Sequence, residues 1–284
     1  MNKQPLAYDD PEFLESDEAR PIRILAEYLE PLRRFREQNI QDTVVFFGSA
    51  RVASRVEARR ALDRLRRGKH GRDYKDALKH GRTAVTWSKY YEDARDLAKR
   101  LTRWSRSLDS PRHRFVVCSG GGPGIMEAAN RGASEAGGKT IGLNIRLPFE
   151  QGANRYITDG LHFEFHYFFM RKFWFAYLAK ALVIFPGGFG TLDEMFEILT
   201  LAQTRKLSKQ LCVILYGSHY WRQVLDLEPL AEWGAIKTSD LELLKWVDTP
   251  ADAFEHLREH LMAYHLVPET AQETQAPGIA KTRG

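Results

Sequence analysis

The stretch Leu182-Val-Ile-Phe-Pro-Gly-Gly-Phe-Gly-Thr-Leu-Asp-Glu194 joins an apolar run to a glycine-rich loop and then to a helical pattern. An earlier stretch repeats this order, as Phe115-Val-Val-Cys-Ser-Gly-Gly-Gly-Pro-Gly-Ile-Met-Glu-Ala-Ala129. Each apolar run is short and is followed closely by glycine, which is typical of a strand buried on both faces. The residues after each loop have helical spacing. Both stretches therefore predict strand–loop–helix units, with helices over 125–136 and 192–204.

Other segments continue the alternation of strand and helix. Apolar runs predict strands over 43–47, 140–145 and 211–216, and helical spacing predicts helices within 11–40 and over 90–101, from about Tyr220, and over 251–264. Continuous apolar strands alternating with helices are typical of a parallel sheet that is covered on both faces. We therefore expect an α/β fold, a Rossmann-like doubly wound parallel sheet, in which ligands bind at the carboxyl ends of the strands.

The chain divides into three expected parts. Residues 1–42 form an N-terminal helical extension, and residues 43–265 form a Rossmann-like nucleotide-binding domain that carries a basic helical insertion over 51–88. The tail, 266–284, has few apolar residues and is expected to be disordered.

The two glycine loops have the composition of a phosphate-binding site. Consecutive glycines let backbone N–H groups approach an anion, and the helix that follows adds a partial positive charge. A tight turn without a ligand is the alternative for either loop, but two such loops in one sheet favour a nucleotide site. Neither loop has the Gly-x-Gly-x-x-Gly spacing of a redox dinucleotide fold, because Ile125 and Asp193 occupy the third glycine position.

Two interpretations fit the residues that open the second helix. Thr191 as N-cap, with Glu194 three residues later, is a capping box that stabilises a helix without any ligand. Alternatively, Asp193 and Glu194 place carboxylates at the entrance of the phosphate site, where one could act on a bound nucleotide. The spacing alone does not decide between the two interpretations.

The charge of the chain is concentrated in one segment. The 284 residues carry a net charge of +5, but residues 51–82 hold twelve basic and four acidic residues, so this segment is +8 and the remainder is −3. A charged helical face in solvent and a site for a polyanion are both consistent with this segment. No aromatic residue lies within 51–73, which argues against a platform for stacking single-stranded bases.

Composition excludes several classes of protein. No apolar run is long enough to span a membrane, and the N-terminus is acidic where a signal peptide would be apolar. Cys118 and Cys212 each lie in an apolar run, as reduced buried cysteines do. We therefore expect a cytoplasmic protein without a metal site. His162 and His166 are expected to pack rather than to bind metal, because no other ligand-type residues cluster with them.

An aromatic segment contains one basic pair. Nine aromatic residues lie between 163 and 177, and only Arg171 and Lys172 add charge to its helix-forming part. So many rings predict core or subunit interface. The basic pair then needs an anionic partner, either a nucleotide phosphate or a nearby carboxylate.

The stretch Pro186-Gly-Gly-Phe-Gly-Thr-Leu-Asp-Glu194 matches the PGGxGTxxE signature of the LOG (LONELY GUY) family, once labelled lysine-decarboxylase-like. Phe47-Gly48-Ser49, the glycines 120–122 and Met170-Arg171-Lys172 follow in the order that this family uses, and the match covers about 43–265. The loop Gly120-Gly-Gly-Pro-Gly-Ile-Met-Glu127 resembles that of the longer bacterial members. The resemblance implies a dimeric Rossmann-like protein that binds nucleoside 5′-monophosphates. It also implies hydrolysis of the N-glycosidic bond to free base and ribose 5-phosphate, with AMP or cytokinin nucleotides as substrates and no cofactor.

The same resemblance assigns roles to particular residues. Glu194 and Arg171 match the catalytic glutamate and arginine of the family. The residues implied to bind the substrate are Gly48, Ser49, Gly120, Gly121, Gly122, Met170, Lys172, Gly187, Gly188, Gly190 and Thr191. A carboxylate is suited to this reaction, since breaking a C1′–N bond builds positive charge on the ribose.

Two rival functions use other features of the same sequence. The chain could bind or sense a purine nucleotide through the glycine loops without turnover. It could also bind nucleic acid through 51–82, with an affinity that falls steeply as salt rises. We rank nucleotide hydrolysis first, binding without turnover second and nucleic-acid binding third. The expected assembly is a homodimer or a larger homo-oligomer.

Overall fold

The computed structural model describes residues 5–68, 71, 73–147, 152–204, 206 and 209–266. Within them lies a seven-stranded sheet, in the order β4-β3-β2-β1-β5-β6-β7, with every neighbouring pair parallel. The strands are β1 (Thr43–Phe47), β2 (Val116–Ser119), β3 (Thr140–Ile145), β4 (His162–Phe165), β5 (Ala179–Ile184), β6 (Cys212–Tyr216) and β7 (Leu244–Val247). The predicted α/β fold with a Rossmann-like parallel sheet is confirmed.

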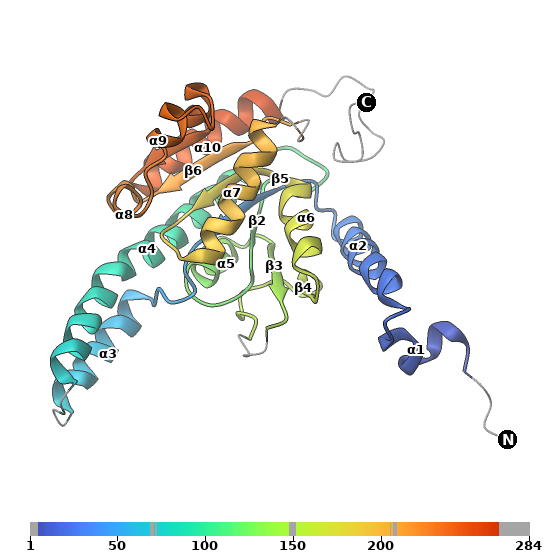
Figure 1. The fold of residues 1–284 in the computed structure, drawn as a ribbon, viewed down its shortest axis with the longest axis horizontal. Helices are drawn as coiled ribbons and strands as arrows, with labels where there is room; N and C mark the ends of the chain where they lie inside the picture. Colours follow the sequence, from blue (N-terminus) through green and yellow to red (C-terminus); the bar gives the residue numbers. More distant parts are fainter. Residues whose placement is uncertain are drawn as a thin grey trace.

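Helices cover both faces of the sheet (Figure 1). The helices are α1 (Pro11–Glu15), α2 (Arg20–Glu37), α3 (Arg55–Arg67), α4 (Tyr74–Arg106), α5 (Ile125–Glu135), α6 (Phe168–Leu178), α7 (Phe189–Gln203), α8 (Ser218–Val224), α9 (Glu228–Glu232) and α10 (Pro250–His265). Two 3-10 helices, η1 (Ala7–Asp9) and η2 (Thr238–Leu243), complete the described elements. None of the described helices is long and apolar enough to cross a membrane.

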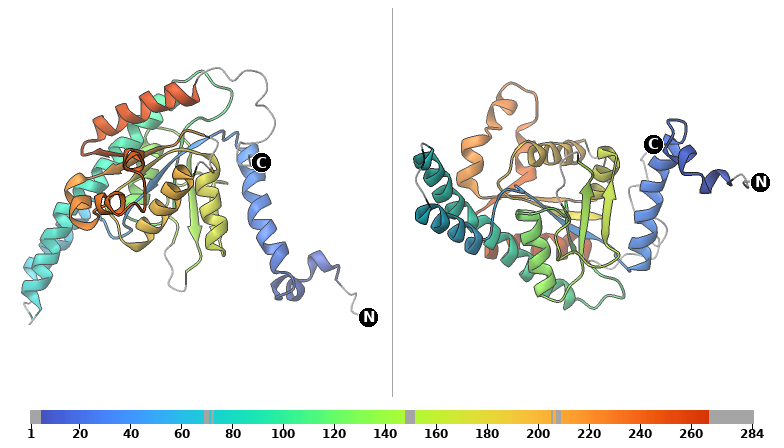
Figure 2. Two further views of the ribbon diagram at one scale, coloured as in Figure 1. Left: turned by 45° about the horizontal axis from the view of Figure 1, so that its top comes forward. Right: turned by 90° about the horizontal axis from the view of Figure 1, so that it is seen from below.

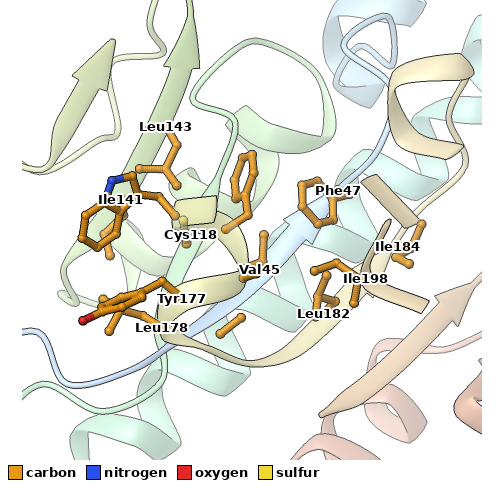
Figure 3. Packing of buried hydrophobic residues seen from close by; sticks show 14 of the residues in the cluster. Val45, Phe47, Cys118, Ile141, Leu143, Tyr177, Leu178, Leu182, Ile184 and Ile198 are labelled. Carbon is orange, nitrogen blue, oxygen red and sulfur yellow. The ribbon is translucent and has the colours of Figure 1, made fainter. Parts of the chain in front are cut away.

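The apolar strands fill two separate cores because successive side chains point to opposite faces. On β1, Val45 and Phe47 enter the core under α6 and α7, and Figure 3 shows them beside Cys118, Ile141 and Leu182. Val44 and Phe46 enter the other core, which α4, α5 and α10 cover. A strand buried on both faces must be apolar at every position, which explains the uninterrupted runs in the sequence.

Two strands lie outside the sequence prediction. β4 lies at one edge of the sheet and β7 at the other. In β4 the burial alternates between exposed and buried positions, and in β7 Lys245 is exposed, so neither segment forms a continuous apolar run. Edge strands are partly open to solvent, and their weaker pattern hides them from a search for fully buried strands.

The basic insertion is a helical hairpin that extends from the body. α3 and the first part of α4 project together, as all three views show (Figures 1 and 2). The helix predicted over 90–101 is only the buried section of α4, which runs without a break from Tyr74 to Arg106. The boundary predicted at residue 88 therefore falls inside one continuous helix.

The N-terminal extension stands apart in a different direction (Figure 2). The helix predicted within 11–40 forms mainly as α2, but Ile22, Leu25 and Leu29 are about half exposed. Opposite them, Phe35 is buried in the core against Phe163. Residues 267–284 of the predicted tail lie outside the described residues.

Candidate nucleotide site

Three loops meet at the carboxyl edge of the sheet, after β1, β2 and β5. These strands are adjacent, and the chain proceeds from β1 toward one edge and from β5 toward the other. Ser49 ties the loops together, since its N–H donates to the carbonyl of Pro186 at 3.0 Å and its carbonyl accepts from the N–H of Ile125 at 3.1 Å. A parallel sheet binds ligands at such a reversal of strand order. The structure therefore brings the glycine loops predicted from sequence into one place.

The loop after β2 is held by buried polar side chains. Ser119 accepts a hydrogen bond from the N–H of Gly121 at 3.0 Å and donates to Asn130 at 2.7 Å. The amide of Asn154 donates to the carbonyls of Gly121 and Gly122 at 3.0 and 3.1 Å. These bonds fix the loop before any ligand arrives. Sequence reasoning missed Asn130 and Asn154, because each lies outside the glycine motif.

Close packing explains why glycine is needed in this loop. Gly121 has φ +74°, and a Cβ there would lie 1.7 Å from Oδ1 of Asn144. A Cβ on Gly120 would lie 2.7 Å from the guanidinium of Arg171, so the loop packs directly against this arginine. Gly48 contacts Ile125 in the same manner, with 2.8 Å between an added Cβ and that side chain. Gly48 thus serves loop packing in this structure.

The loop after β5 presents a different surface. A Cβ on Gly188 or Gly190 would have no heavy atom within 4 Å, so the space in front of both residues is open. Gly187 by contrast packs on Thr191, whose Oγ1 would lie 2.1 Å from an added Cβ. The first N–H groups of a helix point toward this side and carry partial positive charge. Open space at a helix N-terminus is suited to a phosphate group.

The capping interpretation of Thr191 is wrong. α7 begins at Phe189, its N-cap is Gly188, and no side chain caps it. Thr191 lies within the first turn, and its N–H donates to the carbonyl of Gly188 at 3.0 Å. Glu194 is therefore not the reciprocal partner of an N-cap side chain and is free for another role.

Glu194 lies in an unusual environment for a carboxylate. It is 7% exposed, and burial raises its pKa to about 7 although the charges of Arg171 and Lys172 act in the opposite direction. Desolvation disfavours the charged form of a buried acid. A pKa near neutrality is typical of catalytic carboxyl groups, because the group can then exist in either protonation state at working pH.

Arg171 is anchored beside the loop after β2. Its Nε donates to the carbonyl of Leu143 at 2.8 Å, and its guanidinium lies 5.0 Å from the ring of Phe175. Burial lowers the pKa of Arg171, and the charge of Glu194 opposes that shift. The guanidinium is thus fixed in orientation, with a carboxylate near enough to interact electrostatically.

Lys172 and Met170 serve the packing of α6. Lys172 forms ion pairs with Asp193 at 2.8 Å and with Glu197 at 3.1 Å, and these pairs join α6 to α7. Met170 is buried in the core under the sheet. The anionic partner expected for the basic pair is therefore, for Lys172, a pair of carboxylates within the chain.

Tyr220 supports the loop after β5 from α8. Its hydroxyl donates to the carbonyl of Gly187 at 2.8 Å, and the ring of Trp87 packs on it edge-on at 5.4 Å. This residue lies outside the glycine motif, and no spacing in the sequence relates it to that loop. Among the described residues, no group of three or more His, Cys, Asp or Glu side chains could hold a metal ion.

A parallel sheet whose glycine loops meet at its carboxyl edge defines the class of α/β proteins that have a ligand site at that edge. Comparison with known proteins refines this class. A family model described as possible lysine decarboxylase matches residues 126–257, the region from α5 to α10. This segment contains Arg171, Glu194 and the whole loop after β5.

Several proteins of similar sequence are named for the same enzymatic activity. The probable cytokinin riboside 5′-monophosphate phosphoribohydrolase LOG6 of Arabidopsis thaliana is 27% identical over 172 residues, which cover 61% of this chain and 81% of that protein. The cytokinin riboside 5′-monophosphate phosphoribohydrolase of Rhodococcoides fascians is 31% identical over 113 residues, which cover 39% and 56%. The predicted resemblance to the LOG family is confirmed, and the enzymes named are hydrolases of N-glycosyl bonds.

Solved structures include a molybdenum cofactor carrier protein from Chlamydomonas reinhardtii. It is 19% identical, covers 78% of this chain and 99% of its own, and superposes with a TM-score of 0.42.

Proposed function

We propose that the protein is a nucleoside 5′-monophosphate phosphoribohydrolase, which releases a free base and ribose 5-phosphate. The observation that carries the proposal is the buried Glu194, whose pKa is raised to about 7 at the place where both glycine loops meet. The names of the similar proteins support the same reaction class. AMP is the first substrate to test, since it lacks the side chain of a cytokinin nucleotide.

In this proposal the loop after β5 binds the 5′-phosphate. The open space before Gly188 and Gly190 receives the phosphate oxygens, and the N–H groups of the first turn of α7 donate to them. Glu194 lies one turn further along α7, which directs it toward the sugar rather than toward the phosphate. The sugar carbon C1′ then faces the carboxylate.

Glu194 acts on the developing charge of the ribose. As the C1′–N bond breaks, the ribose gains oxocarbenium character, and a carboxylate stabilises this charge and orients the attacking water. Burial strengthens the effect because few water molecules compete with the carboxylate. Arg171, fixed by Leu143 and the wall of the Gly120 loop, orients the substrate and favours the ionised form of Glu194.

The experiment that tests the proposal is a panel of purine and pyrimidine nucleoside monophosphates incubated with the purified protein. Chromatography should detect free base and ribose 5-phosphate in equal amounts from at least one substrate. Saturable nucleotide binding without any base release would instead favour the binding protein without turnover.

The pH dependence of base release gives a sharper prediction. Because the carboxylate form of Glu194 is required and its pKa is about 7, the rate under saturating substrate should rise as pH increases through about 7. An ordinary glutamate would be fully ionised well below that pH. A rate of base release that stays constant from about pH 5 to about pH 8 would contradict the assignment of Glu194 as the catalytic carboxylate.

Replacement of Tyr220 by Phe should weaken substrate binding. The substitution removes only the hydroxyl that holds the carbonyl of Gly187, so the ring contact with Trp87 stays. The lost hydrogen bond is worth about 1 kcal/mol, which predicts a roughly fivefold rise in KM for the nucleotide and a smaller change in kcat. Inhibition by inorganic phosphate should weaken by the same factor. An unchanged KM would show that Tyr220 does not support the phosphate loop.

A further inference from the structure

The N-terminal extension has an acidic end. Residues 5–19 include six acidic residues and no basic residue, a net charge of −6; the acids are Asp9, Asp10, Glu12, Glu15, Asp17 and Glu18. All of them are exposed except Asp10, which caps α1. The segment is held in place by Arg23, whose Nη1 donates to the carbonyls of Leu14 and Ser16 at 2.7 and 2.6 Å. The acidic end is therefore a fixed surface.

The helical hairpin of α3 and early α4, which we call the basic arm, has the opposite charge. Its described residues 55–67 and 73–82 hold nine basic and four acidic residues, a net charge of +5. The basic residues, all exposed, are Arg55, Arg59, Arg60, Arg64, Arg66, Arg67, Lys75, Lys79 and Arg82. Asp63 pairs with Arg66 at 3.7 Å, and Glu57 is bound in a capping box with Ser54. Most of the positive charge therefore faces solvent.

The buried apolar residues of the basic arm pack between its two helices, whereas Val56 is exposed. Ala58 and Leu62 are buried between the two helices, and the close approach of Gly81 to Leu62 leaves 3.0 Å for an added Cβ. The outer surface of the arm is therefore mainly charged. A partner of this surface must be acidic rather than apolar.

These two charged surfaces cannot meet within one copy of the chain. They lie at opposite ends of the molecule in each view (Figures 1 and 2). α2 attaches the acidic end to the body near β4, where Trp174 donates to the carbonyl of Glu27 at 2.9 Å and Arg34 donates to that of His162 at 3.0 Å. The arm is equally fixed, because α4 continues into the core. Contact between them requires two copies.

We infer that the basic arm of one copy docks on the acidic end of the N-terminal extension of a second copy. Charges of +5 and −6 nearly compensate each other, and a two-fold axis would form the contact twice. Nucleic acid would satisfy the arm but leave the acidic end without a partner. A second copy accounts for both surfaces, and it also covers Tyr8 and Phe13, which are exposed beside the acids.

The strength of this contact should depend on salt. Single ion pairs on a surface contribute at most about 1 kcal/mol, so several must act together. Salt screens such exposed charges over about 10 Å. The assembly is therefore expected to lose mass as ionic strength rises, whether or not the protein hydrolyses nucleotides.

Charge reversal provides the test. One variant of the full chain carries Arg59→Glu, Arg60→Glu and Arg64→Glu, and the other carries Asp9→Lys, Glu12→Lys and Glu15→Lys. The first variant changes the arm from +5 to −1, because 5 − 6 = −1, and the second changes the acidic end from −6 to 0, because −6 + 6 = 0. Neither variant alone keeps opposite net charges at the contact, so each should associate about tenfold more weakly than the unmodified chain. In a mixed pair one contact has the unmodified charges of +5 and −6, and the other sets three new glutamates against three new lysines. Native mass spectrometry at low salt should then show mixed assemblies in excess over the random proportion.

The matched control reverses an exposed pair on α10, Glu255→Lys with Arg258→Glu, which should leave the assembly unchanged. Random mixing of the two variants, or an unmodified chain that stays monomeric at low salt, would overturn the inference. A salt-dependent affinity for duplex DNA that the arm variant loses, with random mixing, would assign the arm to nucleic acid instead. Recovery of assembly on mixing also shows that both variants are folded.

Discussion

Replacement of Glu194 by Gln should abolish base release while nucleotide binding survives. The amide has nearly the same shape but carries no negative charge to stabilise the oxocarbenium-like ribose. We expect kcat to fall by about a hundredfold to ten-thousandfold, which is the range that positioned acid or base groups commonly contribute. Titration calorimetry with AMP should give an affinity within about threefold of that of the unmodified protein, since the phosphate contacts are retained.

The same variant should be more stable above neutral pH. The folded state raises the pKa of Glu194 from 4.5 to about 7, so the unfolded chain loses its proton first as pH rises. The contribution of Glu194 to the free energy of unfolding is fully present below pH 4.5 and is lost as pH increases through about 7. The loss amounts to on the order of 3 kcal/mol. Glutamine avoids that loss. Thermal unfolding at about pH 4, below both pKa values, and at about pH 8, above both, should show the gain only at the higher pH.

Glu197 provides the control for both measurements. It lies one turn further along α7 and pairs with Lys172 at 3.1 Å. Glu197→Gln should change kcat by less than about threefold, because the loss of one ion pair does not remove the charge at the sugar. Equal loss of activity in both variants would show that Glu194 has no special role. A Glu194→Gln enzyme with ordinary activity would refute the proposed mechanism outright.

Two glycine substitutions should separate the effect of the loops on the stability of the fold from their effect on the affinity for AMP. A Cβ on Gly124 would lie 2.3 Å from the carbonyl oxygen of Ser49 and 2.7 Å from the backbone of Ala50, and its φ of +73° already disfavours alanine. Because backbone atoms cannot move aside cheaply, Gly124→Ala should cost more than about 3 kcal/mol. For a chain of this size the melting temperature should fall by about 6 to 12 °C.

Gly190→Ala should have the opposite effect. Nothing lies within 4 Å of the added Cβ, so the melting temperature should stay within about 2 °C. The methyl group would occupy the space proposed for the phosphate, and the affinity for AMP should fall at least about tenfold. If Gly190→Ala binds AMP normally, the phosphate lies elsewhere. If Gly124→Ala melts normally, the loops after β1 and β2 are not packed as described.

The sequence alone was sufficient to predict those features whose physical signal lies within one short segment. Strands β1 and β5 contain uninterrupted apolar runs, 44–47 and 181–184, because both faces are buried there, and this pattern is visible without any neighbour. The glycine loops are equally visible, since the demand for glycine arises from backbone geometry and close packing. These two signals were enough to predict the parallel sheet and the loops that meet at its carboxyl edge.

Other features depend on contacts between distant segments. The capping-box interpretation of Thr191 is wrong because α7 begins at Phe189, three residues before the predicted start at Leu192. The pairing of Lys172 with Asp193 depends on how α6 and α7 pack together. Likewise Asn154 reaches the loop after β2 across 33 residues of chain. The spacing of residues along the sequence carries no information on contacts between such distant segments.

The continuity of α4 has a consequence for how this molecule can vary in size. The helix has 33 residues and, at about 1.5 Å per residue, spans about 50 Å. Trp87, near the middle of α4, packs against Tyr220, whereas the N-terminal turns of α4 belong to the hairpin with α3. Adding or removing whole turns in both hairpin helices would therefore change the reach of the protein without displacing any group at the glycine loops. The hairpin length is a dimension that can change independently of the chemistry.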